Sequence, residues 1–196
     1  MPSTSVSQEE LVMLGPTVER LLDRIASRDQ IDQWDKADNL PRSVLEEIAA
    51  AGLCGIAVPT RYGGLELGDR ALFDVIRRLS RRYSGLATLF IGCVSYAGLT
   101  LTHLGSDEQK DTLLPRVAAG ELIFALGLSE PNVGSDLASV ETTAVVDGDH
   151  IVINGAKRWI SGADYSDFIY ALVRSGPVDQ RRNNLSFVLI PANAPG

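Results

Sequence analysis

The chain has 196 residues, of which 45% are hydrophobic and 22% are charged, so it can bury a core in one domain or in two small ones. Its net charge of -7 argues against nucleic acid as a general partner, because binding to phosphate backbones needs a surplus of Lys and Arg on one face. Two cysteines, Cys54 and Cys93, imply neither a disulfide framework nor a cysteine-rich metal site, and they favour a reducing, cytoplasmic setting.

The first part of the chain carries helix signals. Residues 1–8 are polar and lack the features of a secretory signal, so no export is expected. Ser7 and Glu10 have the spacing of a capping box before apolar residues at helical intervals, and Pro16 should kink or restart that helix. A second helix is predicted from Pro41 to Ala51, closed by Gly52 as a left-handed cap, and later ones at roughly 69–82, 85–104 and 107–119.

The predicted helix at 85–104 lies in a stretch that is long enough to cross a membrane. Tyr83 to Ser106 contains no Asp, Glu, Lys or Arg over 24 positions. Glycines and Ser or Thr hydroxyls recur along it, however, which makes it weakly apolar for a lone span. We therefore favour a buried helix of a soluble protein over a membrane span.

After Gly120 the pattern changes from helical to strand periodicity. Asp147-Gly148 and Asn154-Gly155 are two-residue hairpin signals, flanked by predicted strands at 140–146 and 150–153. Further β-rich runs occupy 168–174 and 185–191. The sequence thus predicts an α+β chain, with an all-helical domain over residues 1–120 and a small antiparallel β-barrel or sandwich over residues 121–196.

Two segments of the second domain carry candidate chemistry. Residues 126–136 read LGLSEPNVGSD, which places hydroxyls and a glycine at a bend whose backbone N–H groups could cradle a phosphate. From spacing alone, a plain surface turn is the commoner interpretation. Residues 154–161 read NGAKRWIS, with Trp159 in a predicted strand two positions before the Ser161 hydroxyl. A lone Trp in a sheet is usually a core residue.

Together the two segments resemble the middle domain of acyl-CoA dehydrogenases, in which Thr/Ser-Glu-Pro-x-x-Gly-Ser-Asp and Asn-Gly-x-Lys-x-Trp/Phe-Ile-Thr/Ser wrap FAD. Residues 59–64, 105–110 and 114–121 look like the same family and occur in the family order. The resemblance implies an N-terminal helical domain and a middle β-barrel, followed in a complete member by a four-helix bundle. It also implies that hydride passes from substrate to flavin N5.

The resemblance assigns roles to particular residues. Ser129 is expected at the flavin pyrimidine edge and Ser135 at the diphosphate. An aromatic at the Trp159 position lies beside the isoalloxazine, and a hydroxyl at the Ser161 position hydrogen-bonds near N5. The predicted FAD-binding set is Leu126, Leu128, Ser129, Gly134, Ser135, Trp159 and Ser161. The predicted substrate-binding set, for the acyl-CoA, is Ser135, Cys93, Ser95, Tyr96 and Leu99.

The expected reaction is α,β-desaturation of an acyl-CoA thioester, in which a base removes the α-proton while flavin N5 takes the β-hydride. In most of the family that base is a Glu of the C-terminal bundle, so no catalytic residue is assigned here. The chain alone is expected to be an incomplete catalyst that retains FAD weakly. Implied partners are acyl-CoA, electron-transfer flavoprotein or a similar acceptor, and further subunits, identical or not, in a dimer or tetramer.

Two other hypotheses stay open. One is an acyl-CoA oxidase or flavin monooxygenase of the same fold, and the other is a non-catalytic chain that binds an acyl thioester or pairs with a catalytic partner. A basic cluster, Arg77, Arg78, Arg81 and Arg82, could receive the nucleotide end of coenzyme A, although a solvated face or a subunit contact is commoner. No metal site is expected, because His103 and His150 are isolated and no zinc-binding motif occurs.

Overall fold

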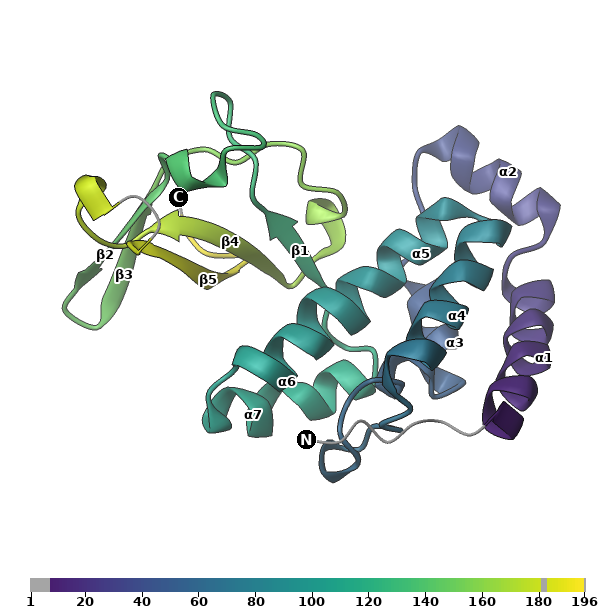
Figure 1. Cartoon of the computed structure of the whole chain (residues 1–196). Coiled ribbons are helices and arrows are strands. Elements are labelled where there is room, and N and C mark those ends of the chain that lie inside the picture. Colours follow the sequence, from purple (N-terminus) through teal and green to yellow (C-terminus); the bar gives the residue numbers. More distant parts are fainter. Residues whose placement is uncertain (1–7, 181–182, 196) are drawn as a thin grey trace. The chain divides into compact units, whose positions relative to one another are not determined.

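The computed structural model describes residues 8–180 and 183–195. The chain divides into two compact units, Met1–Ile123 and Phe124–Gly196, called here the helical unit and the sheet unit. Figure 1 shows helices in the first and strands in the second.

The helical unit follows the predicted order of helices, with one addition. Pro16 lies inside the first helix without ending it, and Ser7, its predicted cap, lies outside the described residues. The helix over 28–37 was not predicted, although Ser27 and Gln30 form a complete capping box at its start. The helices are α1 (Gln8–Ile25), α2 (Arg28–Ala37), α3 (Ser43–Ala50), α4 (Gly68–Arg82), α5 (Ser84–Ile91), the π-helical segment η3 (Gly92–Leu99), α6 (Thr100–Leu104) and α7 (Asp107–Ala118).

The core of the helical unit is apolar. Its largest fully buried side chains come from several helices and one short turn: Leu22, Leu45, Ile48, Leu53, Ile56, Leu72, Leu79, Leu86, Leu89, Phe90 and Leu101. Gly120 ends α7 with a φ of 72°, and a Cβ there would lie 2.5 Å from the Cβ of Ala49, so glycine permits the close approach of α3. The helical pattern of the sequence thus builds a closely packed interior.

The stretch Ser84–Leu104, formed by α5, η3 and α6, is one helical run that is long and apolar enough to cross a membrane by composition. More than half of its apolar window, 56%, is buried inside the structure. Phe90 and Cys93 on this run have no exposed surface. This burial supports the interpretation of a core helix.

The sheet unit is mixed rather than antiparallel. Its strands are β1 (Phe124–Gly127), β2 (Thr143–Asp147), β3 (His150–Asn154), β4 (Phe168–Arg174) and β5 (Leu185–Pro191), in the order β1-β4-β2-β3 with β5 also paired to β4. β1 runs parallel to β4, and so does β2 through one bridge, whereas β2–β3 and β4–β5 are antiparallel. The prediction of an all-antiparallel sheet was wrong, and the pairing path of the described strands does not close into a barrel.

The physical reason lies in the connections. Asp147-Gly148 leads into the predicted hairpin, because Gly148 adopts a φ of 61° between β2 and β3. Asn154-Gly155 does not form a second hairpin. Gly155 has a φ of 153° and opens an irregular segment that returns to β4 through a long connection, and such connections permit parallel pairing.

Candidate functional site

The bend after β1 is held by reciprocal backbone hydrogen bonds. The Glu130 N–H donates to the Val133 carbonyl at 2.8 Å, and the Val133 N–H donates back at 3.3 Å, so Pro131 and Asn132 form a tight turn. Val133 packs into a small apolar cluster with Val140 and Leu172, against which Leu128 also packs. The bend is therefore anchored at both ends.

The two motif segments, residues 126–136 and 154–161, lie against each other in the sheet unit. The Arg158 N–H donates to the Ser129 carbonyl at 2.9 Å. The Lys157 ammonium donates to the Leu128 carbonyl at 3.2 Å and forms an ion pair with Glu130 at 2.7 Å. Segments nearly thirty positions apart in sequence thus share one small region.

Glu130 is a buried carboxylate with several donors. Its oxygens accept from the Glu141 N–H at 2.6 Å and from the Thr142 N–H at 3.0 Å, besides Lys157. Burial alone would raise the pKa of Glu130, but the hydrogen bonds from Lys157 and from residues 141 and 142 outweigh it and lower the pKa from 4.5 to about 2. Glu130 is therefore a fixed negative charge, unsuited to act as a base near neutral pH.

The outer side of the bend offers unused donors. Gly134 and Ser135 are exposed, and in the described part of the chain their N–H groups donate to no protein acceptor. A Cβ at Gly134 would meet nothing within 4 Å, so space is open beside its backbone. Free N–H groups and hydroxyls around such a bend suit a phosphate oxygen. The chemistry of this bend fits the diphosphate of a dinucleotide.

Trp159 is not a strand or core residue. The structure places residues 155–160 outside any strand, and Trp159 is 78% exposed with a φ of 60°, which is rare for a bulky residue. The Arg158 guanidinium stacks on its ring at 4.3 Å. Ser161, two positions on, is also exposed. An exposed indole on an unfavourable backbone conformation leaves a large aromatic surface free to contact a ligand.

Comparison with known proteins assigns both units to domains of one family. Residues 8–121 match the family model for the acyl-CoA dehydrogenase N-terminal domain, and residues 125–196 match the model for its middle domain. The chain belongs to the acyl-CoA dehydrogenase family. The family consists of flavin-dependent oxidoreductases.

Among its relatives, acyl-CoA dehydrogenase FadE26 of Mycobacterium tuberculosis is 36% identical over 161 residues, which cover 81% of this chain and 40% of that protein. The crystal structure of an acyl-CoA dehydrogenase from Geobacillus kaustophilus aligns with a TM-score of 0.89 at 29% identity and covers 97% of this chain and 50% of that one. The ChsE4-ChsE5 complex from M. tuberculosis aligns with a TM-score of 0.81 at 30% identity, over 98% and 49%. The chain thus spans half or less of the length of these acyl-CoA dehydrogenase relatives.

The predicted substrate residues of the helical unit lie on η3. Cys93 is fully buried, and its thiol contacts the Val117 carbonyl at 3.5 Å, so it packs η3 against α7. Ser95, Tyr96 and Leu99 are half-buried. Of the predicted substrate set on this helix, these three retain surface that an acyl group could contact.

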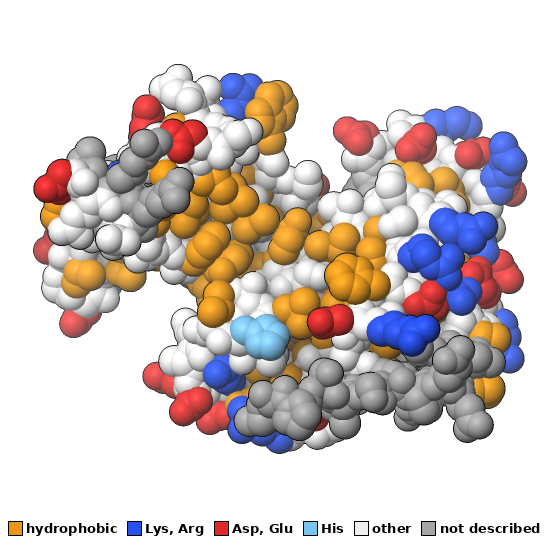
Figure 2. Space-filling view, viewed as in Figure 1, with side chains coloured by type: hydrophobic (Ala, Val, Ile, Leu, Met, Phe, Trp, Pro, Cys, Tyr) orange, Lys and Arg blue, Asp and Glu red, His pale blue; other side chains and the backbone are white. Residues whose placement is uncertain are grey.

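Two arginines of the basic cluster on α4, Arg78 and Arg82, attach this helix to α1. Arg77 and Arg78 pair with Asp74, and Arg78 also reaches Glu19 at 2.7 Å. Arg82 pairs with Asp23 and donates to two carbonyls of the α1 end. Figure 2 shows basic and acidic side chains intermingled over this part of the helical unit. The neighbouring carboxylates leave little net positive charge for a nucleotide.

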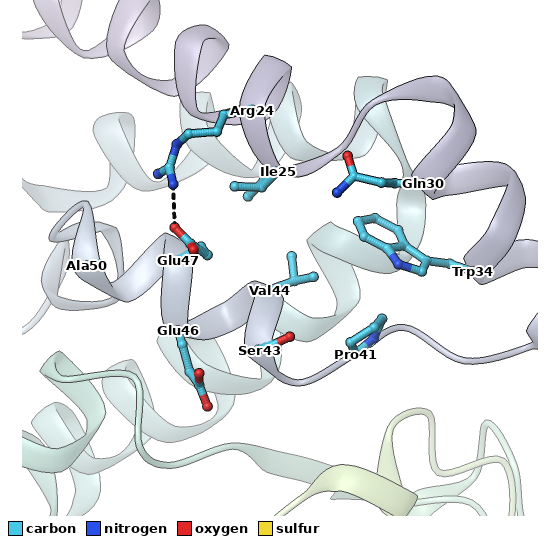
Figure 3. Close-up of a pocket in the computed structure, with 10 residues that line it drawn as sticks. All are labelled: Arg24, Ile25, Gln30, Trp34, Pro41, Ser43, Val44, Glu46, Glu47 and Ala50. Atoms are coloured by element: carbon cyan, nitrogen blue, oxygen red, sulfur yellow. Dashed lines mark hydrogen bonds and ion pairs between the residues drawn. The ribbon is translucent and has the colours of Figure 1, made fainter.

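A pocket of about 470 Å³ in the helical unit contains none of the predicted site residues. Figure 3 shows the Arg24–Glu47 ion pair at 2.6 Å on one side of it and the Trp34 ring on another. Its lining is Arg24, Ile25, Gln30, Trp34, Pro41, Ser43, Val44, Glu46, Glu47 and Ala50. No cluster of three or more metal-ligating side chains occurs among the residues that the structure describes.

The roles of Glu130 and Lys157, which connect the two segments, were not predicted from the sequence. Both residues are part of the motifs that carry the family resemblance, but roles were predicted only for residues near them. The available sequence signal for a buried ion pair was an acidic residue in one motif and a basic residue in the other.

Proposed function

We propose that this chain forms the N-terminal helical and flavin-binding middle parts of an FAD-dependent acyl-CoA dehydrogenase that desaturates an acyl-CoA thioester. The observation that carries the proposal is the attachment of the two motif segments to each other through Lys157 and Arg158. This attachment leaves the outer donors of the bend, Trp159 and Ser161 exposed in the same unit.

Different residues would contact different parts of FAD. The N–H groups and hydroxyl at Gly134 and Ser135 would bind the diphosphate, and the Ser129 hydroxyl would meet the pyrimidine edge. Main chain at Leu126 and Leu128 would contact the ring system. Trp159 would lie beside the ring, and the Ser161 hydroxyl would donate a hydrogen bond where negative charge develops. When bound, FAD supplies the hydride acceptor.

The acyl-CoA is assigned to Ser135 and to η3, where Ser95, Tyr96 and Leu99 offer partly exposed surface for an acyl chain. The α-proton goes to a base that is not among the residues assigned in this chain. We further propose a cytoplasmic enzyme that acts in a dimer or tetramer, with identical or related subunits, and passes electrons to electron-transfer flavoprotein or a similar acceptor.

Flavin absorbance tests the proposal. The protein in its complete assembled form should show flavin bands, and anaerobic addition of a series of acyl-CoA thioesters should bleach them with at least one member. Reoxidation by oxygen compared with an electron-transfer protein separates a dehydrogenase from an oxidase. Absence of flavin bands and of bleaching with every thioester would contradict the proposal and favour a non-catalytic binding chain.

A further inference from the structure

The Glu130–Lys157 ion pair connects segments of the chain to one another and does not bind a ligand directly. The Glu130 side chain is 2% exposed and that of Lys157 is 8% exposed, so neither presents charge to solvent. Their contacts involve the bend, the segment that enters β2, and the second motif segment. One carboxylate therefore sets the relative position of three pieces of irregular backbone.

Lys157 adds a second constraint. Its ammonium donates to the Leu128 carbonyl as well as to Glu130, and the adjacent Arg158 N–H donates to the Ser129 carbonyl. The lysine stem passes close to Gly127, where an added Cβ would lie 3.6 Å from the Lys157 Cγ. Register between the segments is thus fixed at three consecutive positions of the first motif, 128 to 130.

A buried ion pair is a costly way to obtain stability alone, because apolar residues of similar volume often stabilise as well or better. What the pair supplies is position, because buried charges must keep their hydrogen-bond partners, and those partners belong to separate segments of the chain. The backbone of Trp159 needs such a constraint. Its φ of 60° is unfavourable for a bulky side chain and persists only where the surrounding chain is held.

We propose that Glu130 and Lys157 are a positioning pair, which fixes the Ser129–Ser135 bend against the Trp159–Ser161 segment so that both meet the flavin in one geometry. The inference rests on the proposed function. Loss of the pair should let the segment after Lys157 shift, which would move the Trp159 ring. Flavin binding should then weaken, although the pair itself does not contact the flavin.

The test uses Trp159 as its own probe. The chain has two tryptophans, Trp34 and Trp159, so a Trp34→Phe background isolates the second. In that background we would compare Lys157→Met, Glu130→Gln and the double variant. Lys36→Met, at an exposed position of α2, is the matched control. The readouts are Trp159 emission, its quenching by acrylamide, the denaturation midpoint, and FAD affinity from flavin fluorescence.

Each single variant should shift Trp159 emission and weaken FAD binding by about tenfold, the loss expected for one hydrogen bond to a charged group. The double variant removes both buried charges and keeps one amide acceptor for the backbone. It should recover most of the denaturation midpoint while Trp159 emission and FAD affinity stay altered.

That separation distinguishes positioning from a merely structural role. If Trp159 emission and FAD affinity in Lys157→Met match those of Lys36→Met, or if the double variant recovers all readouts together, the positioning proposal is wrong. If Glu130→Gln fails to fold, the comparison of Lys157→Met with Lys36→Met still tests the proposal. If the protein in its complete assembled form binds no FAD, the proposed function fails, while Trp159 emission of the chain still reports whether the pair holds the segment.

Discussion

The two units solve the same problem of backbone hydrogen bonding in different ways. In the helical unit, helices satisfy most of their own N–H and C=O groups, and the core side chains are apolar. In the sheet unit, long irregular segments separate the strands. Among residues whose side chains are described, every buried polar one lies there: Glu130, Thr142, Ser166, Arg174 and Asn184.

Three of these side chains, those of Glu130, Arg174 and Asn184, supply hydrogen bonds to backbone outside α-helices and strands. Arg174 donates to the carbonyls of Ala138 and Val140 and to the Asn184 side chain. Glu130 accepts from two N–H groups before β2, and Asn184 donates to the carbonyl of Pro177. A buried backbone group needs a partner, and in loops that partner is often a side chain. The sheet unit should therefore respond to charge, and the helical unit to side-chain volume.

The largest expected effect is a cavity in the helical unit. Phe90 is fully buried, so Phe90→Ala should lower the free energy of unfolding of this unit by about 3–5 kcal/mol. Chemical denaturation in a Trp159→Phe background, followed by Trp34 emission, measures it. Phe73, on α4, is 66% exposed, and Phe73→Ala should change stability by less than about 0.5 kcal/mol. Equal effects of the two substitutions would contradict the described core.

Acid should destabilise the sheet unit through Glu130. The pKa of Glu130 lies near 2 in the folded protein and at 4.5 ordinarily, so the unfolded chain binds more protons in this interval. Stability from this group is fully present above about pH 4.5 and is lost as the pH falls toward 2, by about 3 kcal/mol in total. Denaturation of Trp34→Phe protein between pH 6 and pH 2, followed by Trp159, measures this loss, with Glu130→Gln as the control.

That control should flatten most of the pH dependence of Trp159 unfolding, because the amide that replaces the carboxylate has no proton to gain. If the variant keeps the full acid slope of the parent, other carboxylates cause the loss of stability and Glu130 does not carry the charge sensitivity of the unit.

The same contrast explains what the sequence could predict. Helices appear in it as apolar periodicity and end signals, which were enough to locate most helical ranges and the left-handed residue at Gly52. The β2–β3 hairpin followed from Asp147-Gly148. The parallel pairing of β1 with β4 did not, because it depends on a long connection with no periodic signal.

At the candidate site, the motif residues were found through family resemblance, but their contacts were not. Trp159 was expected in a strand, and Trp and the neighbouring Ile160 are residue types that favour strands. Its left-handed φ follows from contacts of Lys157 and Arg158 with a segment far away in sequence. Local propensity cannot register such tertiary constraints.

A smaller effect is expected from Arg174, the buried guanidinium of the sheet unit. Arg174→Met keeps the stem and removes three hydrogen bonds, which should cost about 2 kcal/mol, since loss of the desolvated charge offsets part of the change. Trp159-detected denaturation measures it. Asp149→Asn, at an exposed position of the same unit, provides the comparison. An unchanged midpoint in Arg174→Met would show that the carbonyls at 138 and 140 do not need this partner.

The smallest effect tests whether charge matters in the helical unit. Arg78 is 22% exposed at its side chain and bridges Asp74 on its own helix to Glu19 on α1. Water and salt screen such pairs, so Arg78→Met should cost about 1 kcal/mol or less, and the cost should shrink in about 1 M salt. Arg81→Met, exposed on the same helix, should cost nothing measurable. A salt-independent loss as large as that of Phe90→Ala would mean that the ion pairs, rather than the apolar core, hold α4 to α1.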